Sequence, residues 1–382
     1  MIVYPREWSR RQNSAFASIA AAAGGGRRLA FIGLSLRGFP ETRARTAEAL
    51  ARAKRQPKGR AGRALKAALI AAQYNWSRRF FARHPGHVAM CWNGLTGSRR
   101  AYMQGAADAG ARRLFVELAP LPGRITLDPA GVNAESSVPQ DRAFYDDWAA
   151  GEPSRSGEGW RAAGAGLTAR ASRRGDVAQA GGGGLAGGGG LGEAPFLFVP
   201  LQVPDDSQMR LFAGWAGSLD GFLAALGEAA RALPQGWQLR VKEHPSARVS
   251  LAPQIAAAVM ASGGRIVTDN ATDSFAQLAA SRGVVTINSS MGLQAFFHDK
   301  PVIATGRAFW AQPGLVTVAG SAEALCAALA GAGTLAFDAA FRARFMNWLD
   351  RDYYARVTKT AGGDWLVDPA AVRAVLARPA AG

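Results

Sequence analysis

The sequence predicts an α/β protein made of two Rossmann-like domains, and three observations support this prediction. Short apolar segments alternate with segments of helical character in both halves of the chain. A glycine-rich stretch separates the two halves. The chain has 382 residues, enough for two domains of about 150 residues each and an additional segment. Because 48% of the residues are hydrophobic, cores of ordinary size can form and a fully disordered chain is excluded.

We expect the first domain at residues 28–150, after an N-terminal extension at 1–27 that lacks the apolar centre of a signal peptide. Apolar patterns predict strands at 28–34, 87–92 and 113–118. A helix between the last two is indicated by Ser98 as its cap and by the small and apolar residues that follow. The order of strand and helix is that of a first Rossmann-like unit.

Within this domain, residues 43–83 form a predicted basic helical arm. The arm has twelve Lys or Arg and one acid, Glu48. Pro57 and Gly59 should divide it into two helices. Two interpretations remain open: its apolar side chains pack on the domain while its cations are solvated, or it lies in an anionic membrane interface.

The stretch at 151–194 is low in complexity and contains two runs of four glycines. A phosphate-binding loop would lead into the N-terminus of a helix, whereas here an apolar strand follows. We therefore expect a flexible linker between the domains.

The second domain is expected at 195–335. Predicted strands lie at 196–202, 238–242, 265–267, 283–288 and 301–304, and predicted helices at 212–233, 252–261, 274–280 and 291–298. Short apolar strands alternating with helices indicate a parallel sheet covered on both faces. Residues 336–382 should form a C-terminal helix and tail, with the helix at 338–356 capped by Asp338. Two such domains, a linker and a closing helix suggest the GT-B glycosyltransferase architecture, in which ligand binds at the carboxyl ends of the strands.

Composition limits the partners. The net charge of +17 indicates an anionic partner: a nucleic acid, an anionic membrane surface or a nucleotide. Nucleic acid is disfavoured because the cations concentrate in one arm without a recognisable nucleic-acid module. Two cysteines and four histidines argue against a disulfide scaffold and a zinc site, so no metal or cofactor is expected. No apolar run is long enough to span a bilayer, so we expect a cytoplasmic protein, peripheral at the inner membrane.

Polar residues that follow the predicted strands are the candidates for chemistry. Asp206, beside Asp205, follows the strand at 196–202; adjacent acids repel, which can hold one of them neutral or strongly basic. The sequence Pro-Asp-Asp-Ser is equally favourable as a simple turn. In the first domain, Glu117 ends the third strand, where a carboxylate faces ligand or merely solvent.

Two further segments could bind an anion. Lys242 or His244 could neutralise a phosphate after the strand at 238–242, although a lone histidine more often bridges a loop. Ser289 and Ser290 fall where a helix begins, and Gly292 would allow close backbone approach. An ordinary serine N-cap is the alternative there.

Taken in order from about residue 88 to residue 315, several short blocks form one ordered set. They are Trp92-Asn93-Gly94, Glu117 with Leu121-Pro122-Gly123, Asp128 to Asn133, Gln202-Val203-x-x-Asp206-Ser207, Glu243-His244-Pro245, Thr286 to Ala295, and Lys300-Pro301-Val302-Ile303 with Gly306. This set resembles the bacterial capsule polysaccharide biosynthesis proteins, the family of capsular β-Kdo transferases. The chain looks closest to the single-module member, which starts the lipid-linked Kdo oligomer.

The resemblance implies a retaining transferase that moves β-Kdo from CMP-Kdo to a (lyso)phosphatidylglycerol-type lipid or to Kdo already on that lipid. Its further partners would be the inner-membrane surface and the capsule export machinery. It implies Asp206 as nucleophile and Glu117 as acid/base or acceptor-side carboxylate. The remaining implied site residues are Lys242, His244, Pro245, Ser289, Ser290 and Gly292 for the nucleotide, and Asn93, Asp128, Asn133 and Gln202 for the acceptor or cleft. Two alternatives stay open: a GT-B transferase or epimerase that uses a UDP-sugar, and a non-catalytic scaffold docked at the membrane.

Overall fold

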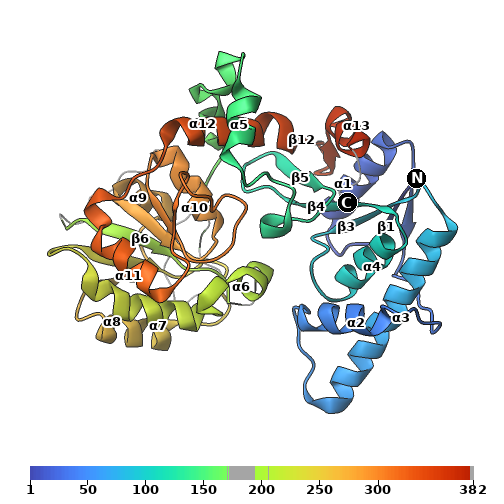
Figure 1. Cartoon of the computed structure of the whole chain (residues 1–382), viewed down its shortest axis with the longest axis horizontal. Helices are drawn as coiled ribbons and strands as arrows, with labels where there is room; N and C mark the ends of the chain where they lie inside the picture. The colour runs from blue at the N-terminus through green and yellow to red at the C-terminus, as the bar shows by residue number, and fades with distance from the viewer. Residues whose placement is uncertain (170, 172–193, 205, 379–382) are drawn as a thin grey trace. The chain divides into compact units, whose positions relative to one another are not determined.

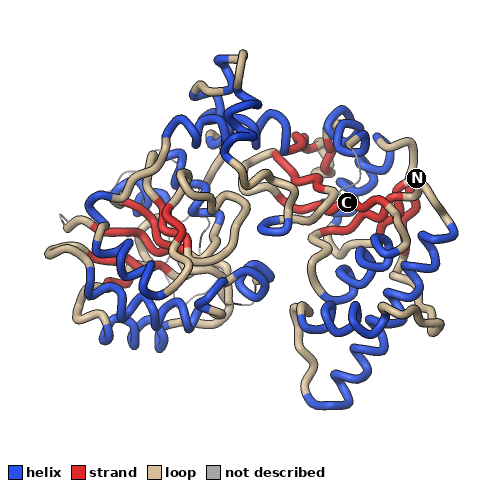
Figure 2. The backbone as a smooth tube through the Cα atoms, in the orientation of Figure 1, coloured by secondary structure: helices blue, strands red, loops and turns tan. Residues whose placement is uncertain are grey.

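The computed structural model describes residues 1–169, 171, 194–204 and 206–378, and it divides into two compact units (Figure 1). Unit 1 comprises Met1–Ala119, Gly123–Val138 and Arg351–Gly382, and unit 2 comprises Pro120–Pro122 and Pro139–Asp350. Each unit has a sheet with helices packed around it (Figure 2). The predicted α/β class with two Rossmann-like units is confirmed.

Unit 1 contains a seven-stranded sheet in the order β13-β12-β5-β4-β3-β1-β2. Strands β1 to β4 are parallel, whereas β5 runs antiparallel to β4 and β12 antiparallel to β5. The strands are β1 (Ile2–Pro5), β2 (Gly26–Leu29), β3 (Val88–Trp92), β4 (Arg112–Leu118), β5 (Arg124–Asp128), β12 (Tyr354–Lys359) and β13 (Trp365–Val367). The helices are α1 (Arg10–Ala22), α2 (Thr42–Ala51), α3 (Gly59–Arg83), α4 (Gly97–Asp108), the 3₁₀ turn η1 (Asn133–Glu135) and α13 (Pro369–Ala377).

The N-terminal residues are core structure, so the expected extension at 1–27 is wrong. Strand β1 is buried along its whole length between β2 and β3. Phe16 and Ile19 of α1 join the hydrophobic core of the same sheet face. The predicted strand at 28–34 is shifted to β2, which ends at Leu29. Four-residue strands are too short for periodicity to reveal them.

The basic arm forms two helices, α2 and α3, as the breaker residues predicted. The C-terminal half of α3 packs tightly on α4, so for this half the packing interpretation is correct. Ile70, Tyr74, Ser77 and Phe81 are buried, and the Ser77 hydroxyl donates to the Tyr102 carbonyl of α4 at 2.6 Å. Helix α4 begins at Gly97 after Thr96, so Ser98 is not its cap.

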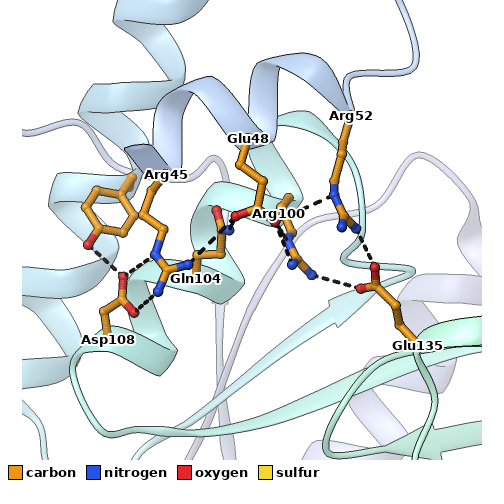
Figure 3. Close-up of polar contacts among 8 residues, drawn as sticks. Arg45, Glu48, Arg52, Arg100, Gln104, Asp108 and Glu135 are labelled. Carbon is orange, nitrogen blue, oxygen red and sulfur yellow. Dashed lines mark hydrogen bonds and ion pairs between the residues drawn. The ribbon is translucent and has the colours of Figure 1, made fainter. Parts of the chain in front are cut away.

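Several cations of the arm are paired in a network between α2 and α4 (Figure 3). Arg45 donates two hydrogen bonds to Asp108, at 2.7 and 2.8 Å. Arg100 binds both Glu48 at 2.8 Å and Glu135 at 3.1 Å. Because these groups are half-buried and share partners, the network fixes α2 against α4 and the turn η1 more firmly than separate surface pairs would.

Unit 2 contains a six-stranded, entirely parallel sheet in the order β11-β10-β9-β6-β7-β8. All five predicted strands are present, with ends shifted by a few residues. The strands are β6 (Phe196–Pro200), β7 (Gln238–Lys242), β8 (Ile266–Thr268), β9 (Gly283–Thr286), β10 (Val302–Ala304) and β11 (Thr317–Val318). The helices are α5 (Arg142–Ala149), α6 (Ser207–Phe212), α7 (Leu219–Ala229), α8 (Ala252–Ala261), α9 (Ser274–Ala280), α10 (Ser290–Gln294) with the 3₁₀ turn η6 (Ala295–His298), α11 (Ala322–Ala330) and α12 (Ala339–Trp348).

Two predictions for unit 2 need correction. The helix expected at 212–233 is interrupted, because Gly214 and Gly217 adopt positive φ between α6 and α7. The first part of the expected linker is packed structure: it forms the 3₁₀ turns η2 (Pro153–Arg155) and η3 (Glu158–Gly164), and Trp160 is buried. The glycine runs themselves lie outside the described residues.

The expected C-terminal helix is shorter than the predicted 338–356. Asp338 caps α12, accepting from the Phe341 amide at 2.8 Å, as predicted. After Trp348 a π-helical turn, Leu349–Tyr353, leads directly into β12, which belongs to the sheet of unit 1. The C-terminal segment is thus divided between the two units. Among the described helices, none has the length and apolar character needed to cross a bilayer.

The close approach of α3 and α4 gives a stability prediction. A Cβ added at Gly105 would lie 2.7 Å from the Tyr74 carbonyl oxygen and 2.9 Å from the Arg78 nitrogen. We expect Gly105→Ala to lower the free energy of unfolding by about 1–3 kcal/mol, since both close contacts are backbone and cannot rotate away. Urea denaturation measures the change.

The control is Gly62→Ala in α3, where the nearest atom is the Pro57 Cβ at 3.5 Å. This substitution should be neutral or stabilising by up to about 1 kcal/mol, because alanine favours helix. Equal effects of the two substitutions would contradict the tight packing at Gly105.

Candidate functional site

Strand order marks where ligands bind in each unit. In open α/β sheets ligands bind at the carboxyl ends of the strands, at the point where the strand order reverses. In unit 1 this point lies between β1 and β3, and in unit 2 it lies between β6 and β9. The residues after these four strands are therefore the candidates, and each unit is treated separately.

A buried acid follows β1. Glu7 lies two residues beyond the strand, and its carboxylate is paired with the guanidinium of Arg99 from α4. Its backbone is held by Asn13, whose side chain accepts from the Glu7 amide at 3.0 Å and donates to the Glu7 carbonyl at 2.7 Å. The Glu7 Oε1 atom is buried without a hydrogen-bond partner among the described residues. Such an unsatisfied buried oxygen is costly, because the carboxyl group has lost its hydrogen bonds to water without gaining others.

The predicted residues Asn93 and Glu117 meet at the same edge. Asn93 directly follows β3 and has φ of 59°, a left-handed conformation that asparagine tolerates better than most residues. Its side-chain amide donates to Glu117 Oε2 at 3.0 Å, and the Leu118 amide donates to Glu117 Oε1 at 3.0 Å. The structure thus joins two residues that the sequence placed 24 positions apart.

Glu7 has a strongly shifted pKa. The pKa of the Glu7 carboxyl is raised to about 7, mainly by burial and also by the charge of Glu117, while Arg99 opposes the shift. A carboxyl group that exchanges its proton near neutral pH has the property required of a general acid or base. Sequence reasoning missed Glu7 because it missed β1; an acid directly after an N-terminal strand was the available signal.

Asp128 has a structural role instead of the predicted contact with an acceptor. It is fully buried and pairs with Phe115 inside the sheet. Oδ1 accepts from the amides of Ala130 and Gly131, and Oδ2 accepts from the Ser137 amide, the Ser137 hydroxyl and the Tyr353 hydroxyl, all within 3.0 Å. These five bonds occupy both oxygens and fold the loop after β5. Asn133, also with positive φ, lies in that loop and caps nothing with its side chain.

In unit 2 a reciprocal amide pair joins β6 to β9. Gln202 donates to Asn288 Oδ1 at 2.8 Å, and its own oxygen accepts from the Asn288 amide at 3.2 Å. Asn288 Nδ2 also faces three carbonyls, those of Gln208, Phe212 and Arg307, at 3.0–3.3 Å. Gln202 is thus committed to the fold and not exposed to the cleft as expected. Asn288, which the sequence did not single out as a site residue, makes the hydrogen bonds that join the segments at the carboxyl ends of these strands.

Asp206 begins α6 as its N-cap. Its Oδ1 accepts from the Gln208 amide at 3.0 Å and from the Ser207 hydroxyl at 3.3 Å. The structure thus contains the turn that the sequence offered as the simpler interpretation, and the Asp206 side chain is half-buried. The neighbouring Asp205 lies outside the described residues.

The end of β7 ties the sheet to the loop after β8. Lys242 is buried, and its Nζ donates to the carbonyls of Asn270 and Thr272 at 2.6 and 2.7 Å. Burial lowers the Lys242 pKa to about 8. Lys242 thus binds backbone where a phosphate was expected. His244 and Pro245 are half-buried, and His244 Nδ1 accepts from the Ser246 amide at 3.0 Å, which closes a turn.

After β9, Ser289 caps α10 and accepts from the Met291 amide at 3.2 Å, while Ser290 is exposed. Gly292 serves packing: a Cβ there would lie 2.3 Å from the indole of buried Trp310. Close approach at Gly292 is therefore made by Trp310, not by a ligand as expected. Among the predicted nucleotide residues, Ser290 is exposed, His244 and Pro245 are half-buried, and Lys242, Ser289 and Gly292 are buried.

Comparison with known proteins finds a family match in the second unit. Residues 192–348 match the family model described as capsule polysaccharide biosynthesis protein. The matched segment covers the whole sheet of unit 2, from β6 to β11, and ends with α12. Asp206, His244 and Ser290 lie within it, and Glu7, Asn93 and Glu117 lie outside it.

Curated relatives extend the similarity. The chain is 29% identical over 288 residues to protein FixF of Sinorhizobium fredii, covering 75% of this chain and 62% of FixF. It is 30% identical over 132 residues to the capsule polysaccharide modification protein LipB of Neisseria meningitidis, covering 31% of this chain and 30% of LipB. The chain therefore spans less than two thirds of either relative.

Among solved structures, the chain is similar to the β-Kdo 2,7-transferase and the β-Kdo 2,4-transferase of Thermosulfurimonas dismutans KpsC. The first has 13% identity, a TM-score of 0.46 and coverage of 78% of this chain and 88% of that chain. The second has 16% identity, a TM-score of 0.41 and coverage of 75% and 86%. At TM-scores below 0.5 these similarities add nothing to the topology described above.

The raised pKa of Glu7 gives a pH prediction. Between the ordinary glutamate pKa of 4.5 and about 7, the folded protein keeps a proton that the unfolded chain has released. The free energy of unfolding should therefore fall as pH rises through this window, by about 3 kcal/mol, and level off above it. Glu7→Gln should remove that slope, as measured by urea denaturation at a series of pH values. A variant that keeps the wild-type slope would show that another group causes it.

Proposed function

We propose that the chain is a capsular glycosyltransferase that moves β-Kdo from CMP-Kdo to a lipid-linked acceptor with retention of configuration. The observation that supports this proposal is that residues 192–348 match the family model of capsule polysaccharide biosynthesis proteins, with Asp206 after β6, next to the reversal point of their sheet. The donor and acceptor follow from the ordered motifs of the sequence, which resemble those of capsular Kdo transferases.

Unit 2 is the proposed donor-binding unit. Its parallel strands point their carboxyl ends toward one edge, where Ser290 and His244 offer hydrogen-bond donors to an anionic leaving group. Gln202 and Asn288 support that edge without contacting the nucleotide, because their amides are used by the fold. The protein thus supplies a pre-arranged polar edge, which lowers the cost of stabilising charge on CMP.

Asp206 is the proposed nucleophile. Its carboxylate attacks the anomeric carbon of Kdo, a C–O bond to Asp206 forms, and the bond to the CMP phosphate oxygen breaks with its electron pair leaving on CMP. An acceptor hydroxyl then attacks the same carbon from the opposite face and releases Asp206. Two inversions give retention. The hydrogen bond from Gln208 holds the carboxylate in one orientation for this attack.

The acceptor hydroxyl must lose a proton in the second step. Glu117, the residue implied by the family resemblance, is the proposed base of unit 1. It is oriented by Asn93, and its charge is coupled to that of Glu7. The negative charge of Glu117 favours the protonated form of Glu7, which places an acid that exchanges its proton near neutral pH in the same unit as the proposed base.

The nucleophile assignment predicts the behaviour of Asp206→Asn. Asparagine caps helices as well as aspartate does, so the fold should be kept, while loss of the nucleophile should reduce transfer at least about a thousandfold. The measurement is mass analysis of product after incubation with CMP-Kdo and a lipid acceptor. The matched control is Asp273→Asn, since Asp273 caps α9 in the same way, with the amides of Phe275 and Ala276. Equal activity of both variants would remove Asp206 from the mechanism.

The donor-site assignment predicts weaker CMP binding in His244→Ala and Ser290→Ala. Each loses one charge-assisted hydrogen bond, worth about 1.5–3 kcal/mol, or roughly a ten- to hundredfold rise in Kd. Calorimetric titration with CMP gives the affinity, and with UDP it tests a uridine nucleotide in its place. Ser9→Ala, an exposed serine before α1 of unit 1, should leave CMP binding unchanged. Unaltered affinity in both unit 2 variants would place the nucleotide elsewhere.

A further inference from the structure

The net positive charge of the chain comes entirely from one part of unit 1. Residues 1–107 contain 20 Lys or Arg and three acids, Glu7, Glu41 and Glu48, so they carry the entire net charge of +17. The remaining residues balance, with 25 bases and 25 acids. No acid occurs between Glu48 and Asp108. A charge distribution this uneven produces a strong positive electrostatic potential near residues 1–107, which attracts anions to this part of unit 1.

Ion pairs neutralise part of this charge and leave other cations of the same stretch unpaired within the described residues. Arg45, Arg52 and Arg100 pair with Glu48, Asp108 and Glu135 beside α2 and α4 (Figure 3). By contrast, Lys58, Arg60 and Arg63 at the start of α3 are exposed and form no ion pair within the described part of the chain. These three cations lie at the start of α3, the long helix that follows α2 along the chain (Figure 1).

Helix α3 carries a second apolar stripe besides the face that packs on α4. The stripe consists of Leu65, Leu69, Ala72, Trp76 and Phe80, at spacings of three or four residues. Its C-terminal half is covered by the loop after β2. The Ser35 amide donates to the Ala72 carbonyl at 2.9 Å, and Gly33 lies so close to the Trp76 indole that a Cβ would be 2.3 Å away.

The N-terminal half of this stripe has no cover. Leu65 is 74% exposed and Leu69 is 44% exposed. The covering loop adds apolar side chains of its own: Phe31 is 75%, Leu34 56% and Leu36 95% exposed. The loop is nevertheless held in place, because Asn75 donates to the Ser35 carbonyl at 3.3 Å and Arg79 donates to the Arg37 carbonyl at 3.1 Å.

These two features adjoin. Leu34 and Leu36 flank Ser35, which is bonded to Ala72, and Leu69 lies one turn before Ala72 on α3. We define the docking patch as the apolar residues Phe31, Leu34, Leu36, Leu65 and Leu69 with the cations Lys58, Arg60 and Arg63. Apolar side chains exposed together on an ordered surface, rimmed by cations, mark a binding surface rather than scattered exposure.

We propose that the docking patch binds the surface of an anionic lipid bilayer. The leucines and Phe31 would enter the acyl boundary, and the three cations would meet lipid phosphates, as in interfacial amphipathic segments. Charge complementarity favours this partner. The patch has cations and no acid, which suits a uniformly anionic surface better than a protein surface of mixed charge. The inference depends on exposure and charge alone and does not use the proposed activity.

The experiment is co-sedimentation of the full chain with two kinds of vesicle: an equal mixture of phosphatidylglycerol and phosphatidylcholine, and phosphatidylcholine alone. We expect binding to the mixture that weakens with salt, and little binding to the neutral vesicles. Each Lys or Arg near an anionic surface strengthens binding about fivefold, so Lys58→Gln, Arg60→Gln and Arg63→Gln together should weaken it on the order of a hundredfold. Leu36→Ser with Leu65→Ser should weaken it about tenfold or more at every salt concentration.

A matched charge control removes three exposed cations elsewhere: Arg248→Gln, Lys359→Gln and Arg373→Gln. This control should bind the mixed vesicles almost as the wild type does. Equal loss in both triple variants would mean that total charge alone attracts the chain, and the docking patch would be rejected. Tight binding to a single-stranded oligonucleotide that is lost in the Lys58, Arg60 and Arg63 variant, without vesicle binding, would also overturn the proposal and assign the patch to nucleic acid.

Discussion

Parallel strands that are covered on both faces place most of their polar side chains where the strands end. This constraint holds for the whole sheet of unit 2 and for strands β1 to β4 of unit 1. Every backbone group inside such a sheet is paired within the ladder, so side chains that carry charge or hydrogen bonds gather where strands end. In unit 2 the carboxyl edge is held by Asn288, which joins β9 to β6 through Gln202 and to α6 through Phe212. In unit 1 the corresponding edge holds Glu7, Asn93 and Glu117.

Hydrogen bonding separates structural from chemical groups among these polar residues. Asp128 and Lys242 are charged side chains at strand ends, yet their polar atoms are occupied by neighbouring backbone and hydroxyl groups. Such groups hold loops in place and have little capacity left for a ligand. Glu7 differs, because it is buried with one oxygen unpartnered and beside a second acid. A motif therefore identifies residue types, but their hydrogen-bond partners decide which residues can act.

The same distinction applies to the cations of unit 1. Those beside α2 and α4 take part in a network that joins these two helices to each other and to the turn η1. Those at the start of α3 adjoin leucines that the fold leaves uncovered. One continuous basic segment of sequence thus contains two surfaces, one that stabilises the unit and one that we assign to a partner.

Local patterns determined much of the fold. Helices at 252–261 and 274–280 and the strand at 238–242 coincide with prediction, because buried periodicity and flanking breakers are contained within a few residues. The sequence predicts Asp206 and Ser289 at strand–helix junctions, as observed, but their capping hydrogen bonds are visible only in the folded structure. Tertiary structure alone decided that β1 is part of the sheet of unit 1. It also decided that the chain after α12 forms β12, which pairs with β5 of unit 1, since both strands are specified by partners distant in sequence. It alone placed Glu7 beside Arg99 and surrounded Asp128 with donors, because burial and hydrogen bonding are properties of the folded surroundings and not of the residue itself.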